Sequence, residues 1–308
     1  MADRKRQRGS ALLIALIAVA LATLLAVGLL ERTQRDLARM EAVLANERSW
    51  QYALGMEVLV RRLLAQAQAE GLNPSELAGR WTEPFAVPGG HVQGRLIDQQ
   101  GRFNLNALAS PDRALATAAQ TRLIRLLERI GLPRSIAPEL SEWVVGTGDA
   151  LGRSVSVGEA WYGSQDPAYR IPGLPLAHVS ELRWLRSVDA EVYQRLLPHV
   201  TALPETSLRV NVNAATPEVL AALIEGLELE QARRILADGP FSDLAQLAAH
   251  PLIAGRMTPE LEAHLGLSSV WYLLQARVVL GGVERDYHRL IHRDGSGYDF
   301  RYFSQGSP

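Results

Sequence analysis

An uncharged run near the N-terminus, Ala11–Leu30, limits what this chain can fold into more than any other feature. Apart from Thr23 and Gly28, the run contains only Leu, Ile, Val and Ala. A helix needs about 20 mainly apolar residues to cross the hydrocarbon layer of a bilayer. The run therefore predicts a membrane-spanning helix.

The helical pattern continues beyond this run. From Glu31 to about Ala69 the sequence has no proline and a single glycine, Gly55. Apolar residues recur there at intervals near three, four and seven, which predicts an amphipathic helix. One continuous helix from Ser10 would be on the order of 90 Å long. The face that we expect to meet partner helices consists of Leu37, Met40, Leu44 and Leu54.

A basic leader precedes the apolar run and ends in Gly9. It carries four cations, and the other side of the run carries as many within the next 18 residues, so the distribution of charge does not fix the orientation. Because long domains cross the membrane largely regardless of charge, we expect the short leader inside and the rest outside. A plain signal anchor, and a cleaved signal with a small-residue site at Ala26-Val27-Gly28, are the alternatives at this point.

Composition argues against several classes of protein. The 32 basic and 33 acidic residues give a formal charge of −1, so no strong field favours nucleic acid. The chain has no cysteine, which excludes disulfides and thiolate metal sites. It also lacks the Gly-x-Ser-x-Gly, His-Glu-x-x-His and Gly-x4-Gly-Lys motifs. We therefore expect no enzyme, and we expect the dispersed histidines, His288 and His292 included, at the surface.

Strand patterns lie at both ends of the part that follows the long helix. A short helix over Pro74–Gly79 and a turn-rich bridge over Pro84–Gly90 come first. Alternating apolar residues then predict two short strands within His91–Asn106, joined by a hairpin-like turn at Asp98–Gly101. Three further strands are predicted near the C-terminus: Val270–Leu280, Glu284–His292 and Tyr298–Phe303. Together they imply one small sheet that a helical insert interrupts.

The insert contains an internal repeat. Phe103-Asn104-Leu105-Asn106-Ala107 is echoed by Val210-Asn211-Val212-Asn213-Ala214. A helix start follows each copy, at Ser110-Pro111 and at Thr216-Pro217. Each copy ends in a similar segment in which a serine is expected to cap a short helix, Val179-Ser180-Glu181-Leu182 and Phe241-Ser242-Asp243-Leu244. The insert is therefore predicted to be two related helical modules.

The second copy resembles the helix-hairpin-helix modules of competence DNA receptors and also SAM-like helical modules. A DNA-binding hairpin presents backbone N–H groups and cations to phosphate. Here the turn around Gly226 instead carries Glu225, Glu228 and Glu230, which would repel a phosphate backbone. We therefore expect no nucleic acid partner, and a membrane-anchored DNA receptor is the alternative function.

The leader resembles the processing site of type IV pilins and of the pseudopilins of type II secretion. That resemblance implies cleavage between Gly9 and Ser10 by the prepilin peptidase, followed by methylation of the new N-terminus. Most members have Glu at the fifth mature position, where this chain has Ile14. Loss of that Glu is characteristic of the minor pseudopilin K family of type II secretion.

Further motifs extend the resemblance to pseudopilin K over most of the chain, in the order of that family. They include Gly101–Asn106, Trp143, Pro167–Arg170, Val179–Arg183, Leu196–Pro204 and the Asn-Val-Asn-Ala motif. The resemblance implies an α+β fold: a pilin-like long helix on a small antiparallel sheet, with a large inserted α-helical domain. The expected segments are a leader (1–9), a membrane half-helix (10–30), a pilin-like body (31–105), a first helical module (106–205), a second SAM-like module (206–268) and C-terminal strands (269–308).

The resemblance also implies a function. Such a protein caps the tip of the secretion pseudopilus and helps to start its assembly. It spans the bacterial inner membrane once, with its C-terminal domain in the periplasm. The implied partners are the I, J and H minor pseudopilins and the major pseudopilin.

Calcium is a further expectation from the family, in which the loop after the conserved tryptophan is acidic. Between Trp143 and Tyr169 this chain offers only Asp149, Glu159 and Asp166 as carboxylates. Calcium takes six to eight oxygen ligands as a rule, so these few acids make either binding or its loss possible. A calcium-dependent surface enzyme is the third alternative, and the sparse acids argue against it.

Overall fold

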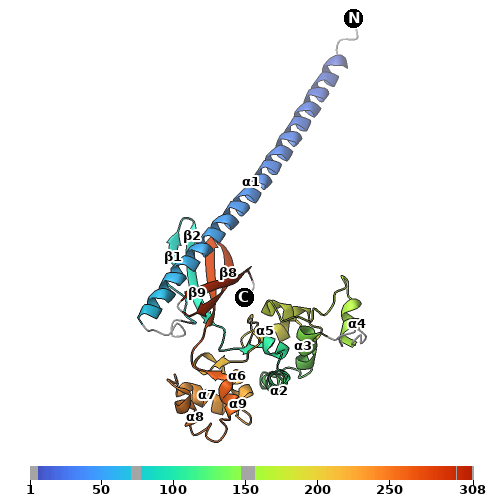
Figure 1. Ribbon diagram of the computed structural model, residues 1–308. Coiled ribbons are helices and arrows are strands. Elements are labelled where there is room, and N and C mark those ends of the chain that lie inside the picture. The colour runs from blue at the N-terminus through green and yellow to red at the C-terminus, as the bar shows by residue number, and fades with distance from the viewer. Residues whose placement is uncertain (1–5, 71–77, 147–156, 296, 307–308) are drawn as a thin grey trace.

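The computed structural model describes residues 6–70, 78–146, 157–295 and 297–306. Helix α1 (Arg6–Ala69) is continuous, as predicted. Its first half stands away from the rest of the protein, and its second half lies on a sheet (Figure 1). The helical insert lies at the end of the molecule that is far from the N-terminus. The predicted helix Pro74–Gly79 falls almost wholly outside the described residues.

The sheet among the described residues has five strands in the order β1-β2-β7-β8-β9, and every pair is antiparallel. All three predicted C-terminal strands are confirmed, and Gly281 and Gly282 form the turn between two of them with positive φ. The fold class is therefore α+β, as expected. The strands are β1 (Phe85–Val87), β2 (Gly90–Asp98), β7 (Trp271–Leu280), β8 (Val283–Asp294) and β9 (Gly297–Gln305).

Packing of α1 on the sheet follows its apolar spacing. Ala53, Met56, Val60, Leu64 and Ala67 are buried at intervals of three and four, so they lie along one side of the helix. They cover the face of the sheet that carries the alternate buried residues of β2 and β7. A Cβ on Gly94 would lie 2.4 Å from the terminal methyl of Met56, so this glycine permits the close approach of helix and sheet.

Two predictions near the first strands are wrong. The bridge over Pro84–Gly90 contains strand β1, which pairs with β2 around a turn of Pro88 and Gly89. Proline followed by a glycine with φ of +90° suits a type II turn. A three-residue strand beside a proline and two glycines gives almost no pattern of its own.

The hairpin predicted within His91–Asn106 does not form either. Strand β2 pairs with β7 instead, and β3 (Phe103–Asn104) pairs in parallel with β4 (Val200–Thr201) in the insert. The carboxylate of Asp98 accepts hydrogen bonds from the backbone N–H of Gln100 and Gly101 at 2.9 and 3.0 Å. These bonds turn the chain out of the sheet.

The insert consists of two modules with the same plan. In each, a two-residue strand, a 3-10 turn and several helices are closed by a returning two-residue parallel strand. Module one (103–205) contains β3, η2 (Leu105–Ala109), α2 (Arg113–Arg129), α3 (Ile136–Val145), α4 (Val157–Gly163), η3 (Val179–Trp184), α5 (Ala190–Leu196) and β4. Module two (206–268) contains β5 (Val210–Asn211), η4 (Val212–Ala214), α6 (Pro217–Leu223), α7 (Leu229–Ala237), α8 (Leu244–Ala248), α9 (Pro259–Ala263) and β6 (Leu265–Gly266).

The helix starts that were predicted from the repeat are partly displaced. Thr216 caps α6 with Pro217 at its first turn, as expected. In module one, however, the cap of α2 is Asp112 rather than Ser110, because its carboxylate accepts from the N–H of Ala114 at 2.8 Å. The serine caps are also wrong, since His178 caps η3 and Asp243 caps α8.

Candidate partner-binding surfaces

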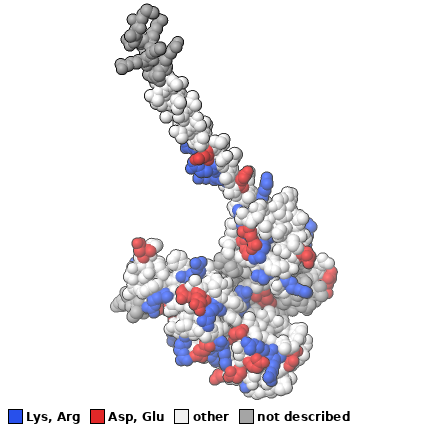
Figure 2. Space-filling model, turned by 180° about the vertical axis from the view of Figure 1, so that it is seen from behind, with Lys and Arg blue, Asp and Glu red and all other residues white. Residues whose placement is uncertain are grey.

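The predicted membrane half of α1 is exposed and lies apart from the rest of the described residues. Every residue from Ala11 to Leu44 is exposed. Among the described residues one helix is long and apolar enough to cross a membrane, and its most apolar window has a mean hydropathy of 2.9. The surface of this half is white in Figure 2, and charged side chains begin further down the helix. Helix α1 therefore fits a single-pass anchor.

The predicted processing residues lie at the start of this helix. The backbone of Gly9 and Ser10 is helical and continuous with the rest of α1. Ile14 follows in the exposed part, with 66% of its surface accessible. Cleavage after Gly9 stays a prediction.

An apolar stripe on the second half of α1 faces away from the sheet. Leu37, Met40 and Leu44 are exposed by 53 to 62%. Val58, exposed by 52%, lies on the same side about four turns further on, beyond Glu47 and Gln51. On a helix of 3.6 residues per turn these positions point away from the side that carries Met56, Val60 and Leu64. Leu54, the fourth predicted position, is only half-buried and lies at the edge of the stripe. Large apolar side chains in a row on an exposed surface mark an interaction site.

The predicted calcium ligands are not brought together within the described residues. Asp149 lies outside them, Glu159 is in α4, and Asp166 precedes a cis proline. No group of three or more acidic or histidine side chains that could hold a metal ion occurs in the part of the chain that the structure describes.

Aromatic side chains, which the sequence did not single out as a group, surround this region instead. The rings of Trp143, Tyr162, Tyr169 and Trp184 follow one another with centroid separations of 5.3 to 5.4 Å. The hydroxyl of Tyr162 donates to Glu139 at 2.7 Å, and burial raises the pKa of this tyrosine well above its usual value. The cluster fixes α4 to the rest of module one.

The insert leaves the sheet and returns to it at one buried polar joint. Asp98 pairs with Tyr272 across the two strands that the insert connects. One carboxylate oxygen of Asp98 accepts from the hydroxyl of Ser269 at 2.8 Å, and the other accepts from the side-chain amide of Asn211 at 3.2 Å. Asp98 and Asn211 are 9% and 1% exposed, so these hydrogen bonds replace water that burial removes. The joint attaches the insert to the sheet.

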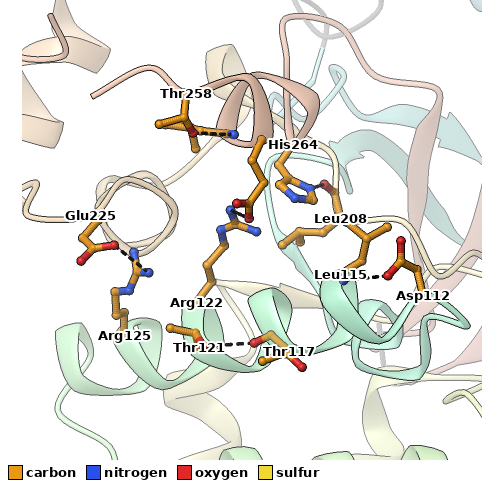
Figure 3. Close-up of polar contacts among 12 residues, drawn as sticks. Asp112, Leu115, Thr117, Thr121, Arg122, Arg125, Leu208, Glu225, Thr258 and His264 are labelled. Carbon is orange, nitrogen blue, oxygen red and sulfur yellow. Dashed lines mark hydrogen bonds and ion pairs between the residues drawn. The ribbon is translucent and has the colours of Figure 1, made fainter. Parts of the chain in front are cut away.

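The acidic turn of module two faces module one (Figure 3). Two arginines of α2, four residues apart, reach it. Nη2 of Arg125 lies 3.7 Å from Oε2 of Glu225, and Nη1 donates to the carbonyl of Ala222. Nη1 of Arg129 lies 3.0 Å from Oε2 of Glu228, and Nη2 donates to the carbonyl of Leu227. This face, Arg122-Arg125-Arg129, was missed from the sequence, although its spacing could have shown it. These contacts hold the turn against α2 of module one.

Comparison with known proteins places this geometry in a family. Two family models, both described as "Type II secretion system (T2SS), protein K", match residues 101–205 and 210–268. Type II secretion system protein K of Klebsiella pneumoniae is 33% identical over 94% of both chains. The protein of the same name from Pseudomonas aeruginosa is 34% identical over 72% of this chain and 69% of its own.

A solved structure is similar as well. A chain from the crystal structure of the GspK-GspI-GspJ complex of the enterotoxigenic Escherichia coli type 2 secretion system superposes with a TM-score of 0.75. It is 26% identical and covers 88% of this chain and all of its own length.

Proposed function

This chain belongs to the type II secretion system protein K family, and we propose that as a minor pseudopilin it caps the tip of the pseudopilus and helps to start its assembly. The position of the insert carries this proposal. The two modules lie at the end of the molecule that is far from the membrane half of α1 (Figure 1). In a filament of parallel helices, a subunit added above would clash with them. The chain is therefore limited to the last position.

The residue at position 14 supports the same position. A buried carboxylate is costly unless it meets a partner charge. In a pilin filament the fifth mature residue meets the N-terminal amine of a neighbouring subunit. A subunit with nothing above it has no such amine to neutralise, and the apolar Ile14 suits it.

The partners of the proposal are other pseudopilins. The stripe of Leu37, Met40 and Leu44 offers apolar surface for neighbouring helices. The similar chain from Escherichia coli was solved with GspI and GspJ, so we propose the I and J types as direct neighbours, and the H type and the major pseudopilin below them. We place the membrane half in the inner membrane and the remainder in the periplasm, after processing at Gly9 by the prepilin peptidase.

Processing is tested by the mass of the N-terminal peptide from membranes of the native host. We expect a peptide that begins at methylated Ser10. Gly9→Leu should leave the precursor uncut, whereas Gly28→Leu, at a helical glycine with open space around it, should be processed normally. A peptide that begins at Met1 or at Leu29 would contradict the filament mechanism.

The tip position is tested with a single label, because the chain has no cysteine of its own. Arg234→Cys places a thiol on the exposed surface of α7, where maleimide gold can mark it on isolated pseudopili. We expect gold at one end of each filament. Gold along the length of the filament would show that other subunits can follow this one.

The stripe is tested by co-purification of the full chain with its partners from membranes. Met40→Asp should weaken recovery of the I and J pseudopilins by at least about tenfold, because it puts a charge into an apolar contact. Leu174→Asp is the matched control, since Leu174 is equally exposed at 64% but lies in the insert. Equal recovery with both variants would remove the stripe from the interface.

A further inference from the structure

A polar cavity lies between α2 of module one and the turns of module two (Figure 3). Its volume is about 340 Å³, which is large enough for a small ligand with some of its water. Three arginines line it: Arg122 and Arg125 from α2, and Arg256 from the segment that precedes α9. The cavity is therefore lined by arginines of both modules. The proposed tip function assigns no role to it.

Arg122 is buried with part of its hydrogen-bonding capacity unused. Arg122 is 6% exposed, and its Nη2 donates to the carboxylate of Glu260 at 3.0 Å. Nη1 of the same guanidinium has no hydrogen-bond partner among the described residues. A buried N–H group without a partner is costly, so a ligand that accepts from it would be stabilised.

Arg256 provides a second buried N–H from the opposite side. Its Nη1 is also unpartnered within the described part of the chain. That atom lies 3.9 Å from the position that a Cβ would take on Gly226, in the turn between α6 and α7. The hydroxyl of Thr258 accepts from the N–H of Leu261 at 3.1 Å, so its proton is left to donate. Donors from several elements thus surround one space.

The acids nearby do not fill this space. Glu225 and Glu260 also line the cavity, but their side chains are 90% and 63% exposed. Exposed carboxylates attract a neighbouring cation only weakly because water screens them. Three guanidinium groups against two such carboxylates leave a net positive charge, and the unpartnered N–H groups are on the buried side.

We propose that this cavity binds a small oxyanion, held by Arg122 and Arg256. Guanidinium groups match the oxygens of phosphate and carboxylate, to which they donate two parallel hydrogen bonds. The ligand is either a free phosphate or the terminal carboxylate of a polypeptide, which share this chemistry. Binding would join α2 to module two and so stabilise the contact between the modules. The inference does not depend on the tip position.

The test uses the full chain in detergent micelles and inorganic phosphate as the probe. Isothermal titration should show saturable binding of one phosphate per chain, in a buffer whose ionic strength is held constant with chloride. Arg256→Gln should weaken it by about tenfold or more, the usual effect of losing a charge-assisted hydrogen bond. Arg122→Gln should do the same but also removes the contact with Glu260, so Arg256→Gln, at a partly exposed site, is the safer variant.

Arg233→Gln is the matched control, because Arg233 is an exposed arginine of module two that pairs with Glu230 away from the cavity. It should leave phosphate binding within about twofold of the wild type. Equal binding of phosphate by the Arg256→Gln and Arg233→Gln variants would overturn the proposal.

The source of the oxyanion is distinguished by a second ligand. A short peptide with a free C-terminal carboxylate is titrated beside the same peptide with an amidated end. If the free peptide binds, competes with phosphate and is weakened by Arg256→Gln, the ligand is a polypeptide terminus. If only phosphate binds, the ligand is a free anion. Failure of both the phosphate and the peptide to bind would overturn the site itself.

Discussion

The two modules of the insert carry the same Asn-x-Asn-Ala motif. The second asparagine has equivalent partners in both modules, whereas the first asparagine does not. Asn106 and Asn213 are the second asparagines, and each side chain bonds both backbone groups of one residue. Asn106 makes a pair of hydrogen bonds to the backbone N–H and carbonyl of Leu176, at 2.7 and 2.9 Å. Asn213 makes the same pair to Phe241, at 2.8 and 2.9 Å. Each fixes the residue that lies two positions before a helix cap.

The first asparagines of the two motifs have different partners. Asn104 donates to the carbonyls of Glu205 and Ser207, where the chain leaves module one. Asn211 donates instead to Asp98 and Ser269, where the insert meets the sheet. The motif therefore fixes the local turn, in which each of these asparagines accepts from the N–H two residues on. Its other contacts depend on where the module is attached.

Asparagine to alanine changes at the matching positions should have the largest effect. Asn106→Ala leaves the Leu176 N–H and the Leu176 and Leu203 carbonyls without their partner at a site that is 1% exposed, so we expect a loss of about 3–5 kcal/mol. Asn213→Ala should cost about 2 kcal/mol, because Asn213 is only partly buried. Urea unfolding of the full chain in micelles measures both.

The exposed Asn46 provides the control for this pair, and Asn46→Ala should change stability by less than about 0.5 kcal/mol. Equal losses of stability for Asn106→Ala and Asn213→Ala would contradict the expectation that the more deeply buried asparagine contributes more.

The second prediction concerns pH, because the contacts of the modules with the sheet differ in chemistry. Module two is attached through Asp98, whereas module one meets the sheet beside His288, which is 1% exposed and was expected at the surface. His178 of module one lies against Tyr302 of β9, at 5.2 Å between ring centroids. Burial lowers the pKa of His288 to about 4, against a smaller raising effect of Asp286, while His178 and Arg95 lower it further.

Between pH 6.5 and 4, His288 binds a proton in the unfolded chain but stays neutral in the folded chain. The free energy of unfolding therefore falls as the pH drops towards 4. Between pH 7 and 5 we expect a loss of about 2 kcal/mol from His288. His178 adds to it in the same direction, since burial lowers its pKa as well. Urea midpoints at the two pH values measure the loss.

His288→Gln, which cannot titrate, should remove most of this pH dependence, whereas His91→Gln, at a partly exposed position on β2, should retain it. An unchanged slope in His288→Gln would show that another group sets the acid sensitivity.

The smallest effects are expected at the caps, and they test the alignment of the two modules. Leu176-Ala177-His178-Val179 corresponds in space to Phe241-Ser242-Asp243-Leu244, three residues earlier than the sequence alignment suggested. Asp243→Ala should cost about 1 kcal/mol through loss of the cap to the N–H of Gln246. Ser180→Ala should cost less, since the Ser180 hydroxyl caps no backbone N–H and contacts only Nδ1 of the capping His178, at 2.7 Å. Thermal midpoints of the two variants separate the alignments, and a larger loss in Ser180→Ala would restore the original one.

The sequence by itself determined the features whose cause is local. A long uncharged apolar run followed by spaced apolar residues predicts one continuous helix whose first half suits a membrane, and Gly281-Gly282 between alternating residues predicts a turn between strands. The repeat and the family were likewise visible, because asparagine turns and helix starts use residues that are close together in the chain.

Only the tertiary structure decided which segments pair and which polar groups become buried. Strand β2 pairs with a strand that begins 173 residues after Asp98 in the chain, and nothing in the pattern of β2 specifies that partner. His288, Asp98 and Arg122 are polar residues whose burial results from a neighbouring element that covers them. The physical reason is that hydrogen bonds to caps and turns act within a few residues, whereas burial depends on elements that are distant in sequence and near in space.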